Sequence, residues 1–197
     1  MTEKATLQAI APLVPRGARV LDLGCGDGTL LSYLQRERGC TGYGVEIDDA
    51  NVLACVQRGV NVIQLNLDEG LAIFEDNSFD VVLQIDTLPH LRNAETMLRE
   101  TARVGRTGIV AFPNFAHWPN RLSVLRGRMP VTRRLPYQWY DTPNIRVGTY
   151  KDFEVLAQKN QLRIIDAFGL HEGQTVRWCP NALASTAVFH FDHGKGT

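Results

Sequence analysis

The stretch that decides the fold lies near the N-terminus and reads Val20-Leu21-Asp22-Leu23-Gly24-Cys25-Gly26-Asp27-Gly28. A short apolar run leads into a Gly-x-Gly-x-Gly turn, and apolar residues at helical spacing (Leu30, Leu31 and Leu34) follow directly. Glycine accepts the backbone angles of a tight turn and lets a ligand approach the main chain closely. The stretch therefore predicts a strand, a tight turn and a helix, the first unit of a nucleotide-binding α/β sheet.

The next predicted strand also ends in an acidic residue, as a nucleotide-binding β-α-β unit requires. The apolar run 43–47 carries Glu46, 24 positions after Asp22, close to the roughly 20 expected for a carboxylate that binds ribose. A dinucleotide site would place glycine where Thr29 stands, and the carboxylates of Asp22 and Asp27 would repel a pyrophosphate. The same carboxylates favour a ligand with an ammonium and a sulfonium group, as S-adenosylmethionine (SAM) has.

The pattern Asp-x-Gly-x-Gly-x-Gly with a second strand-end acid resembles the first two motifs of class I SAM-dependent methyltransferases. We expect Glu46 to accept hydrogen bonds from both ribose hydroxyls, Ile47 to pack on the adenine, and Asp22 to orient the turn and the ligand's ammonium. This class commonly places an acid after strand three to meet the adenine amino group, and here Asn66 stands in that place. The predicted cofactor-binding residues are Asp22, Gly24, Cys25, Gly26, Gly28, Glu46, Ile47, Asn66, Leu67 and Gln84.

These motifs do not distinguish SAM from its demethylated product, S-adenosylhomocysteine, as the resident ligand. An empty turn in an unrelated α/β protein is the alternative interpretation. Methyl transfer needs little beyond placement in a dry pocket, so catalytic residues are hard to predict. Asp86 and His90 after strand four and His117 after strand five are weak candidates for a general base, with a surface or hydrogen-bonded loop role as the alternative for each.

Composition narrows the class of protein. The 197 residues predict a single domain, 1–197, and Lys+Arg equals Asp+Glu at 21 each. A balanced charge indicates neither a nucleic-acid partner nor a membrane surface, and the N-terminus lacks an apolar leader, so we expect a cytoplasmic protein. The four cysteines are far apart without a Cys-x-x-Cys pair, which predicts reduced thiols and no metal site.

Strand-like and helical runs alternate along the chain. The predicted strands cover residues 20–23, 43–47, 60–65, 79–85, 108–112, 162–166 and 182–190. The alternation predicts an α/β fold with a doubly wound, mostly parallel seven-stranded sheet, whose last strand pairs antiparallel with its neighbour. Helices are expected at 5–14, from the glycine turn to Gly39, from Asp48 to Gly59, after Asn93 and after Thr149, and a frayed tail at 193–197.

Residues 114–148, which we call the insertion, interrupt this alternation after strand five. They hold six arginines, no lysine and one acid, for a local charge of +5, together with five aromatic residues and four prolines. Roughly half of the aromatic side chains are expected in the core. Arginine and aromatic residues together suit nucleic-acid binding, a lid over an anionic substrate, or a protein-docking surface.

The insertion also carries a more specific resemblance. The quoted stretches are Gly127-Arg128-Met129-Pro130-Val131-Thr132 and Leu135-Pro136-Tyr137-Gln138-Trp139-Tyr140-Asp141-Thr142-Pro143-Asn144-Ile145. They resemble the MetW family of methionine-biosynthesis proteins, as do shorter stretches at 67–71, 103–106, 112–115 and 117–118. The similarity runs from about residue 20 to residue 168.

That resemblance implies a bacterial cytoplasmic protein that works alongside MetX, the homoserine O-acyltransferase of methionine synthesis. It favours a SAM-binding accessory or regulatory partner of that enzyme. An active methyltransferase on a small-molecule acceptor is the second interpretation, and a nucleic-acid methyltransferase or binder is the third. The insertion is the predicted docking surface, with Trp139 and Arg134 as its expected anchors.

Overall fold

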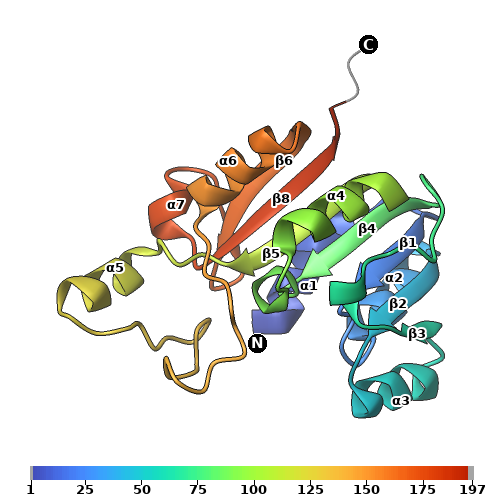
Figure 1. Cartoon of the computed structure of the whole chain (residues 1–197), viewed down its shortest axis with the longest axis horizontal. Helices are drawn as coiled ribbons and strands as arrows, with labels where there is room; N and C mark the ends of the chain where they lie inside the picture. Colours follow the sequence, from blue (N-terminus) through green and yellow to red (C-terminus); the bar gives the residue numbers. More distant parts are fainter. Residues whose placement is uncertain (1, 195–197) are drawn as a thin grey trace.

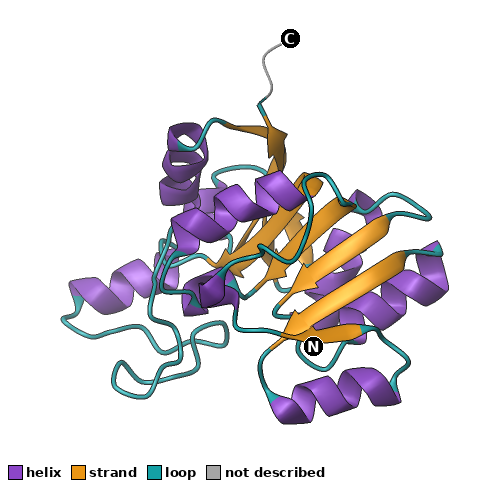
Figure 2. Ribbon diagram, turned by 45° about the vertical axis from the view of Figure 1, so that its right-hand side comes forward, coloured by secondary structure: helices purple, strands orange, loops and turns teal. Residues whose placement is uncertain are grey.

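The computed structural model describes residues 2–194, and within them eight strands form one sheet in the order β3-β2-β1-β4-β5-β8-β6-β7. Figure 2 shows helices on both sides of this sheet. The strands are β1 (Arg19–Leu23), β2 (Thr41–Glu46), β3 (Val62–Gln64), β4 (Phe79–Ile85), β5 (Gly105–Pro113), β6 (Leu162–His171), β7 (Gln174–Val176) and β8 (Thr186–His193). Strands β1 to β5 pair in parallel, and β8 lies antiparallel between β5 and β6. The doubly wound, mostly parallel α/β fold is confirmed.

The described chain has one strand more than the seven predicted. The additional strand, β7, pairs antiparallel with the end of β6 through Glu172 and Gly173, whose φ angles are 49° and 86°. Positive φ at both central residues marks a two-residue hairpin that Asn-Gly or Asp-Gly usually encodes. Glu-Gly is a weaker signal, and a strand of three residues is too short to show alternation. The last strand also begins later than predicted, because Pro180–Leu183 forms a short helix first.

Among the described residues, five α-helices lie close to their predicted positions, whereas the helices at 118–125 and 180–183 have no predicted counterpart. They are α1 (Thr2–Ile10), α2 (Thr29–Arg38), α3 (Asp49–Gln57), α4 (Ala94–Val104), α5 (Trp118–Leu125), α6 (Tyr150–Lys159) and α7 (Pro180–Leu183), with 3-10 helices η1 (Ala11–Leu13), η2 (Leu67–Glu69) and η3 (Leu88–His90). Gly39 ends α2 in the left-handed conformation, and the side chains of Asp48 and Thr149 cap α3 and α6 as expected. Asn93 occupies the cap position of α4 without a side-chain cap bond.

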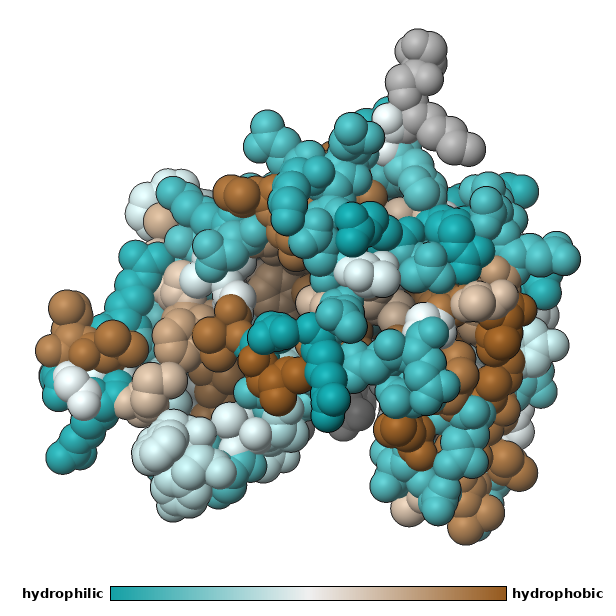
Figure 3. All heavy atoms as spheres, viewed as in Figure 1, coloured by the Kyte–Doolittle hydropathy of each residue, from teal (hydrophilic) through white to brown (hydrophobic). Residues whose placement is uncertain are grey.

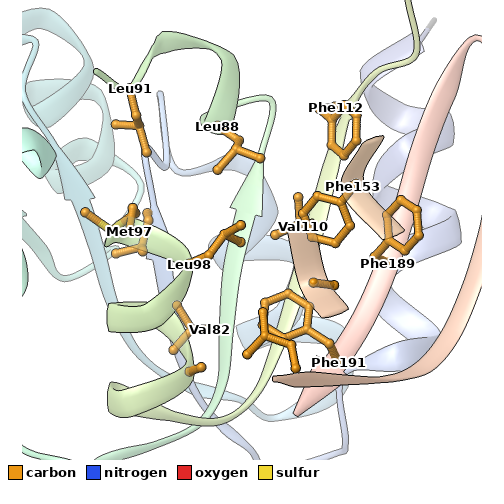
Figure 4. Packing of buried hydrophobic residues seen from close by; sticks show 14 of the residues in the cluster. Val82, Leu88, Leu91, Met97, Leu98, Val110, Phe112, Phe153, Phe189 and Phe191 are labelled. Carbon is orange, nitrogen blue, oxygen red and sulfur yellow. The ribbon is translucent and has the colours of Figure 1, made fainter. Parts of the chain in front are cut away.

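Alternate side chains of each strand point to opposite faces of the sheet, which separates two cores. On one face, α4 and α6 cover the central strands. Figure 4 shows Met97 and Leu98 of α4 on one side of this core and Phe153 of α6 beside Phe189 and Phe191 of β8. The ring centroids of Phe153 and Phe189 are 4.4 Å apart. These aromatic contacts hold the antiparallel part of the sheet to the helix that follows the insertion.

The second core lies under α1, α2 and α3. Ile10, Leu31 and Cys55 come from these helices and pack in the same cluster as Val20 of β1 and Leu83 of β4. No helix among residues 2–194 is long and apolar enough to cross a membrane. Of the predicted tail at 193–197, residues 195–197 lie outside the described part of the chain.

Figure 1 shows α5 and the irregular chain after it projecting from the body of the protein. Hydrophobic side chains gather at the free end of α5, as Figure 3 shows. The exposed aromatic side chains of the insertion, with their exposed fractions, are Trp118 (54%), Tyr137 (48%), Trp139 (71%) and Tyr140 (71%). The expectation that half of its aromatic residues are core is therefore wrong. The helix α5 and the chain after it project away from the body of the protein (Figure 1), so most of these rings have no core to enter.

Candidate functional site

Two cavities meet at the carboxyl ends of β1, β2 and β4, and together they form what we call the cleft. The first, of about 360 Å³, lies between α1 and the glycine turn, and the second, of about 510 Å³, lies between the end of β2 and η2. Gly24, Ile85 and Asp86 border both cavities. Figure 3 shows a notch on this side of the molecule, between the insertion and the part that carries α3. Ligands of open α/β sheets bind at this edge.

The glycine turn is held by the loop that follows β4. Gly24 has a φ of +71°, and a Cβ there would lie 2.6 Å from the hydroxyl oxygen of Thr87. That hydroxyl donates a hydrogen bond of 2.6 Å to the carbonyl of Leu23. A side chain at position 24 would therefore break a buried contact between β1 and the loop after β4 as well as strain the backbone. Thr87 is a site residue that the sequence did not reveal, because the contact spans 64 residues.

Glu46 joins the end of β2 to the glycine turn. The side chain is 9% exposed, and its carboxylate accepts hydrogen bonds from the amides of Gly26 (2.9 Å), Ile47 (2.8 Å) and Asp48 (3.0 Å). A carboxylate offers about four acceptor positions, so about one is left for a ribose hydroxyl. To accept from both hydroxyls, as expected above, Glu46 must share or give up one of these main-chain bonds.

Asp22 is the other predicted carboxylate of the site, and it lines the first cavity. It is 2% exposed, and burial, reinforced by the nearby charge of Glu46, raises the pKa of Asp22 from 3.8 to about 7. A cation placed against this carboxyl group would favour the ionised form and reverse part of that shift. The site is therefore electrostatically suited to a positively charged ligand group.

The second cavity brings together three more of the predicted residues. Ile47 is 60% exposed, whereas Leu67 is 8% exposed, and both line the cavity beside Asn66. The side-chain oxygen of Asn66 accepts a hydrogen bond of 3.1 Å from the amide of Asp68, which caps η2. An amide oxygen has a second lone pair, which leaves Asn66 able to accept from an adenine amino group.

Cys25 and Gly28 lie in the glycine turn where it packs against Cys55 of α3. The Cys25 sulfur lies 3.7 Å from that of Cys55 in α3, and burial raises the pKa of both thiols. Cys25 lines the first cavity, but Gly28 does not line the cleft. A Cβ at Gly28 would lie 2.9 Å from the Cys55 sulfur, so glycine there lets α3 approach the turn. Gly28 thus contributes to packing at the start of α2.

Gln84 is directed away from the cleft. Its side chain is fully buried and its amide nitrogen donates to the hydroxyl of Thr101 in α4. Along β4, Val82 and Gln84 lie on the α4 face, whereas Val81 and Leu83 lie on the face covered by α1 to α3. Position 84 therefore belongs to the core under α4, and this residue does not line either cavity.

The three candidate bases have different surroundings. Asp86 borders both cavities, and His90 lines the second with its Nδ1 atom 3.1 Å from the carbonyl oxygen of Pro143. His117 is 7% exposed and packs against His171 at a ring-centroid distance of 4.9 Å, outside both cavities. Burial, together with His171, lowers the pKa of His117. The structure therefore brings Asp86 and His90 to the cleft and keeps His117 away from it.

Arg134 is the main site residue whose place the sequence did not predict. Expected as a surface anchor, it instead reaches from the insertion into the first cavity, with its side chain 15% exposed, and bonds to the carboxylate of Asp86 at 2.5 Å. Most of its side chain is turned into the cavity, so its role as an anchor of a docking surface stays a prediction. Arg134 is far from Asp86 in sequence, and only the path of the insertion brings the two together.

The arrangement of the sheet and its helices agrees with solved structures. A SAM-dependent methyltransferase of Thermotoga maritima superposes with a TM-score of 0.70 at 19% identity, covering 96% of this chain and 88% of that one. Magnesium protoporphyrin IX methyltransferase of Synechocystis, solved with bound S-adenosylhomocysteine, gives a TM-score of 0.67 at 19% identity, covering 96% and 82%. The fold is that of the class I SAM-dependent methyltransferases.

Sequence comparison narrows this class to one family. The family model of "Methionine biosynthesis protein MetW" matches residues 4–191, and the chain belongs to this family. The bifunctional methionine biosynthesis protein MetXA/MetW of Rhodopirellula baltica is 36% identical over 198 residues, which cover 93% of this chain and 32% of that protein. The chain spans about a third to a half of the length of the curated relatives it matches.

Proposed function

We propose that this protein of methionine biosynthesis binds SAM or S-adenosylhomocysteine in the cleft and acts as an accessory or regulatory partner of the homoserine O-acyltransferase MetX. The observation that carries the ligand assignment is the pair of buried carboxylates, Asp22 and Glu46, at the carboxyl edge of the sheet on either side of the glycine turn. Together they fit a ligand that combines a ribose with positively charged groups.

The two cavities divide the ligand between them. In this proposal the second cavity takes the adenosine, with Glu46 on the ribose, Ile47 on the adenine face and Asn66 on the amino group. The first cavity takes the amino-acid end beside Asp22 and Gly26. Gly24 and Cys25 shape the wall between β1 and the ligand, and Leu67 closes the apolar side of the second cavity. SAM, when bound, supplies an activated methyl group.

A fused relative supports the partner assignment. The match to the Rhodopirellula baltica protein covers 32% of its length, and its name joins MetXA to MetW. Tethering two proteins in one polypeptide raises their effective concentration, which favours pairs that act together. In this chain the insertion offers a surface for such contact, since Trp139 and Tyr140 are each 71% exposed. Exposed tryptophan and tyrosine are frequent anchors of protein interfaces.

An active methyltransferase on a small molecule is the second candidate function. The observation that favours it is the position of Asp86, which borders both cavities with its side chain 41% exposed. A carboxylate there can accept a proton from a hydroxyl or amine acceptor. If this function holds, Asp86→Asn should reduce turnover more than SAM affinity. Retention of full turnover by that variant would remove Asp86 from consideration as the base.

Calorimetric titration tests the main proposal. Purified protein is titrated with SAM and with S-adenosylhomocysteine, alone and together with the acyltransferase. We expect saturable binding of at least one ligand, and a measurable association between the two proteins that depends on that ligand. Absence of binding by both ligands would overturn the ligand assignment. Tight ligand binding without any association between the proteins would overturn the partner role alone.

A further inference from the structure

Arg134 is a charged residue of the insertion that reaches the first cavity of the cleft. One of its terminal nitrogens, Nη2, lies 2.5 Å from a carboxylate oxygen of Asp86. Asp86 itself has a φ of 60°, a left-handed conformation that non-glycine residues seldom adopt. Strained positions of this kind are retained where the surrounding structure holds them, often at ligand sites. The Arg134–Asp86 pair therefore joins the insertion to the end of β4 at the border between the two cavities.

The guanidinium of Arg134 has hydrogen-bonding capacity that Asp86 does not use. Its Nε atom is buried and has no hydrogen-bond partner among the described residues. An arginine carries five N–H donors in a planar fork, and a buried donor without a partner is uncommon in folded proteins. The side chain is only 15% exposed, so bulk water cannot freely satisfy these donors.

The charges around the first cavity make Arg134 distinctive. Asp22, Asp27 and Asp86 line this cavity with carboxylates. Among the side chains that the structure describes, Arg134 is the sole basic residue that lines it. Asp27 is paired on its outer side with Arg58 at 2.5 Å. The cavity thus offers acids to a cation and a single guanidinium to an anion.

We infer that Arg134 binds the carboxylate at the amino-acid end of the ligand. The inference rests on the proposed function, in which that ligand is SAM or S-adenosylhomocysteine. Both molecules end in an ammonium and a carboxylate on one carbon. Asp22 suits the ammonium, and the planar fork of Arg134, oriented by Asp86, suits the two oxygens of the carboxylate.

This assignment ties the ligand to the insertion. Further bonds hold the insertion to the loop after β4, because the amides of Ile145 and Arg146 both donate to the carbonyl of Pro89 at 3.0 Å. A carboxylate bound by Arg134 adds a contact between the ligand and the same segment. The cleft therefore selects ligands that carry the carboxylate, and the insertion that displays Trp139 is the segment that recognises it.

A pair of ligands that differ in this group tests the inference. Decarboxylated SAM keeps the adenosine, the sulfonium and the ammonium but lacks the carboxylate. Calorimetry is run with wild type, Arg134→Ala, Arg134→Lys and Arg133→Ala, the last being an exposed neighbour with the same charge. We expect Arg134→Ala to weaken SAM about ten- to a hundredfold and decarboxylated SAM less than twofold. Arg134→Lys should recover part of the SAM affinity, and Arg133→Ala should bind both ligands like wild type.

The outcomes separate this inference from the proposed function. If SAM binds wild type and Arg134→Ala weakens both ligands equally, Arg134 acts by shaping the cleft and the inference is overturned. Equal affinity of wild type for the two ligands would overturn it as well. If neither ligand nor S-adenosylhomocysteine binds wild type, the proposed function fails first and the inference fails with it. Circular dichroism and melting temperature confirm that each variant is folded before it is titrated.

Discussion

The carboxylate of Glu46 accepts a hydrogen bond of 2.9 Å from the backbone amide of Gly26 and thereby fastens the end of β2 to the glycine turn after β1. The strand-end acid has two tasks in this arrangement. It holds the turn in place through the amide of Gly26. Its remaining lone pair faces the cleft, where it can accept a hydrogen bond from a ligand. Ligand affinity and the stability of the fold are therefore expected to depend on the same side chain.

Glu46→Ala should lower both properties. Three amides, of Gly26, Ile47 and Asp48, lose their acceptor, and we expect a loss of about 1–3 kcal/mol in the free energy of unfolding. SAM affinity should fall about ten- to a hundredfold. Urea denaturation and calorimetry measure the two effects. Asp48→Ala, which removes the α3 cap outside the cleft, serves as the control for stability loss without loss of affinity. Unchanged SAM binding by Glu46→Ala would contradict the ribose assignment.

The pKa of Asp22 predicts a pH dependence of ligand binding. Its folded-state pKa is raised to about 7, so the group is largely protonated below that value and ionised above it. A cationic ligand group prefers the ionised form, and SAM affinity should therefore rise as the pH increases from 6 to 7.5. Asp22→Asn should abolish this rise. An equally steep rise in the Asn variant would assign the dependence to another group.

The same shift predicts a stability effect of opposite sign. The unfolded chain ionises Asp22 near pH 3.8, whereas the folded chain does so only near pH 7. Between these values the folded state holds the extra proton, so stability from this group falls as the pH rises, by at most about 1.4 kcal/mol per pH unit. Asp22→Asn should therefore gain stability relative to wild type between pH 5 and pH 7. Denaturant unfolding without ligand at both pH values measures the difference, and a constant difference would contradict the shift.

Substitution of Gly24 tests the contact between the turn and the loop after β4. Gly24→Ala places a methyl group against Thr87 at a φ of +71°, whereas Gly17→Ala has the same φ with no atom within 4 Å. The backbone strain, about 1–2 kcal/mol, is common to both variants. We expect Gly24→Ala to lose clearly more stability in urea denaturation, and Thr87→Ala in that background to recover part of the loss. An equal loss of unfolding free energy in the two variants would show that the turn accommodates the methyl group, and would contradict this prediction.

The exposed tryptophans provide a matched test of the docking surface. Trp139 in the insertion is 71% exposed and Trp178 outside it is 81% exposed. If the insertion contacts the acyltransferase, Trp139→Ala should weaken the association by about 2 kcal/mol or more, roughly thirtyfold. Trp178→Ala should leave the association unchanged. Both variants should keep wild-type SAM affinity. Equal effects of the two substitutions, or none, would place the interface elsewhere.

Much of the fold could be predicted from local pattern. The strand, glycine turn and helix at residues 20–38 depend on neighbours in sequence, because positive φ and close approach restrict positions 24, 26 and 28 to glycine. The caps at Gly39, Asp48 and Thr149 are also local, since each bonds within one helical turn. The location of Asp22 and Glu46 at one edge of the sheet could also be predicted, because both lie near the carboxyl ends of strands and parallel strands end at the same edge.

The surroundings of two predicted site residues were decided only by tertiary packing. Gln84 lies near the carboxyl end of its strand, as Asp22 and Glu46 do, but its side chain points to the face of β4 that α4 covers and donates to Thr101. His117 follows β5, yet the start of α5 and the end of β6 enclose it against His171. Thr101, which binds Gln84, and His171, which packs on His117, come from other parts of the chain. No local sequence pattern predicts either contact.

The sequence by itself determined the parallel part of the sheet, the glycine turn and the two carboxylates at its edge, because these follow from short-range backbone preferences and from the common edge of parallel strands. Tertiary structure alone decided the place of Arg134, 48 residues from its partner Asp86. It also decided the role of Asn114, whose buried side chain donates to the carbonyls of Pro180, Asn181 and Ala184 and accepts from the amides of Ala116 and Tyr150. Apart from the local bond from Ala116, these bonds depend on the path of the whole chain, so residue type and spacing do not encode them.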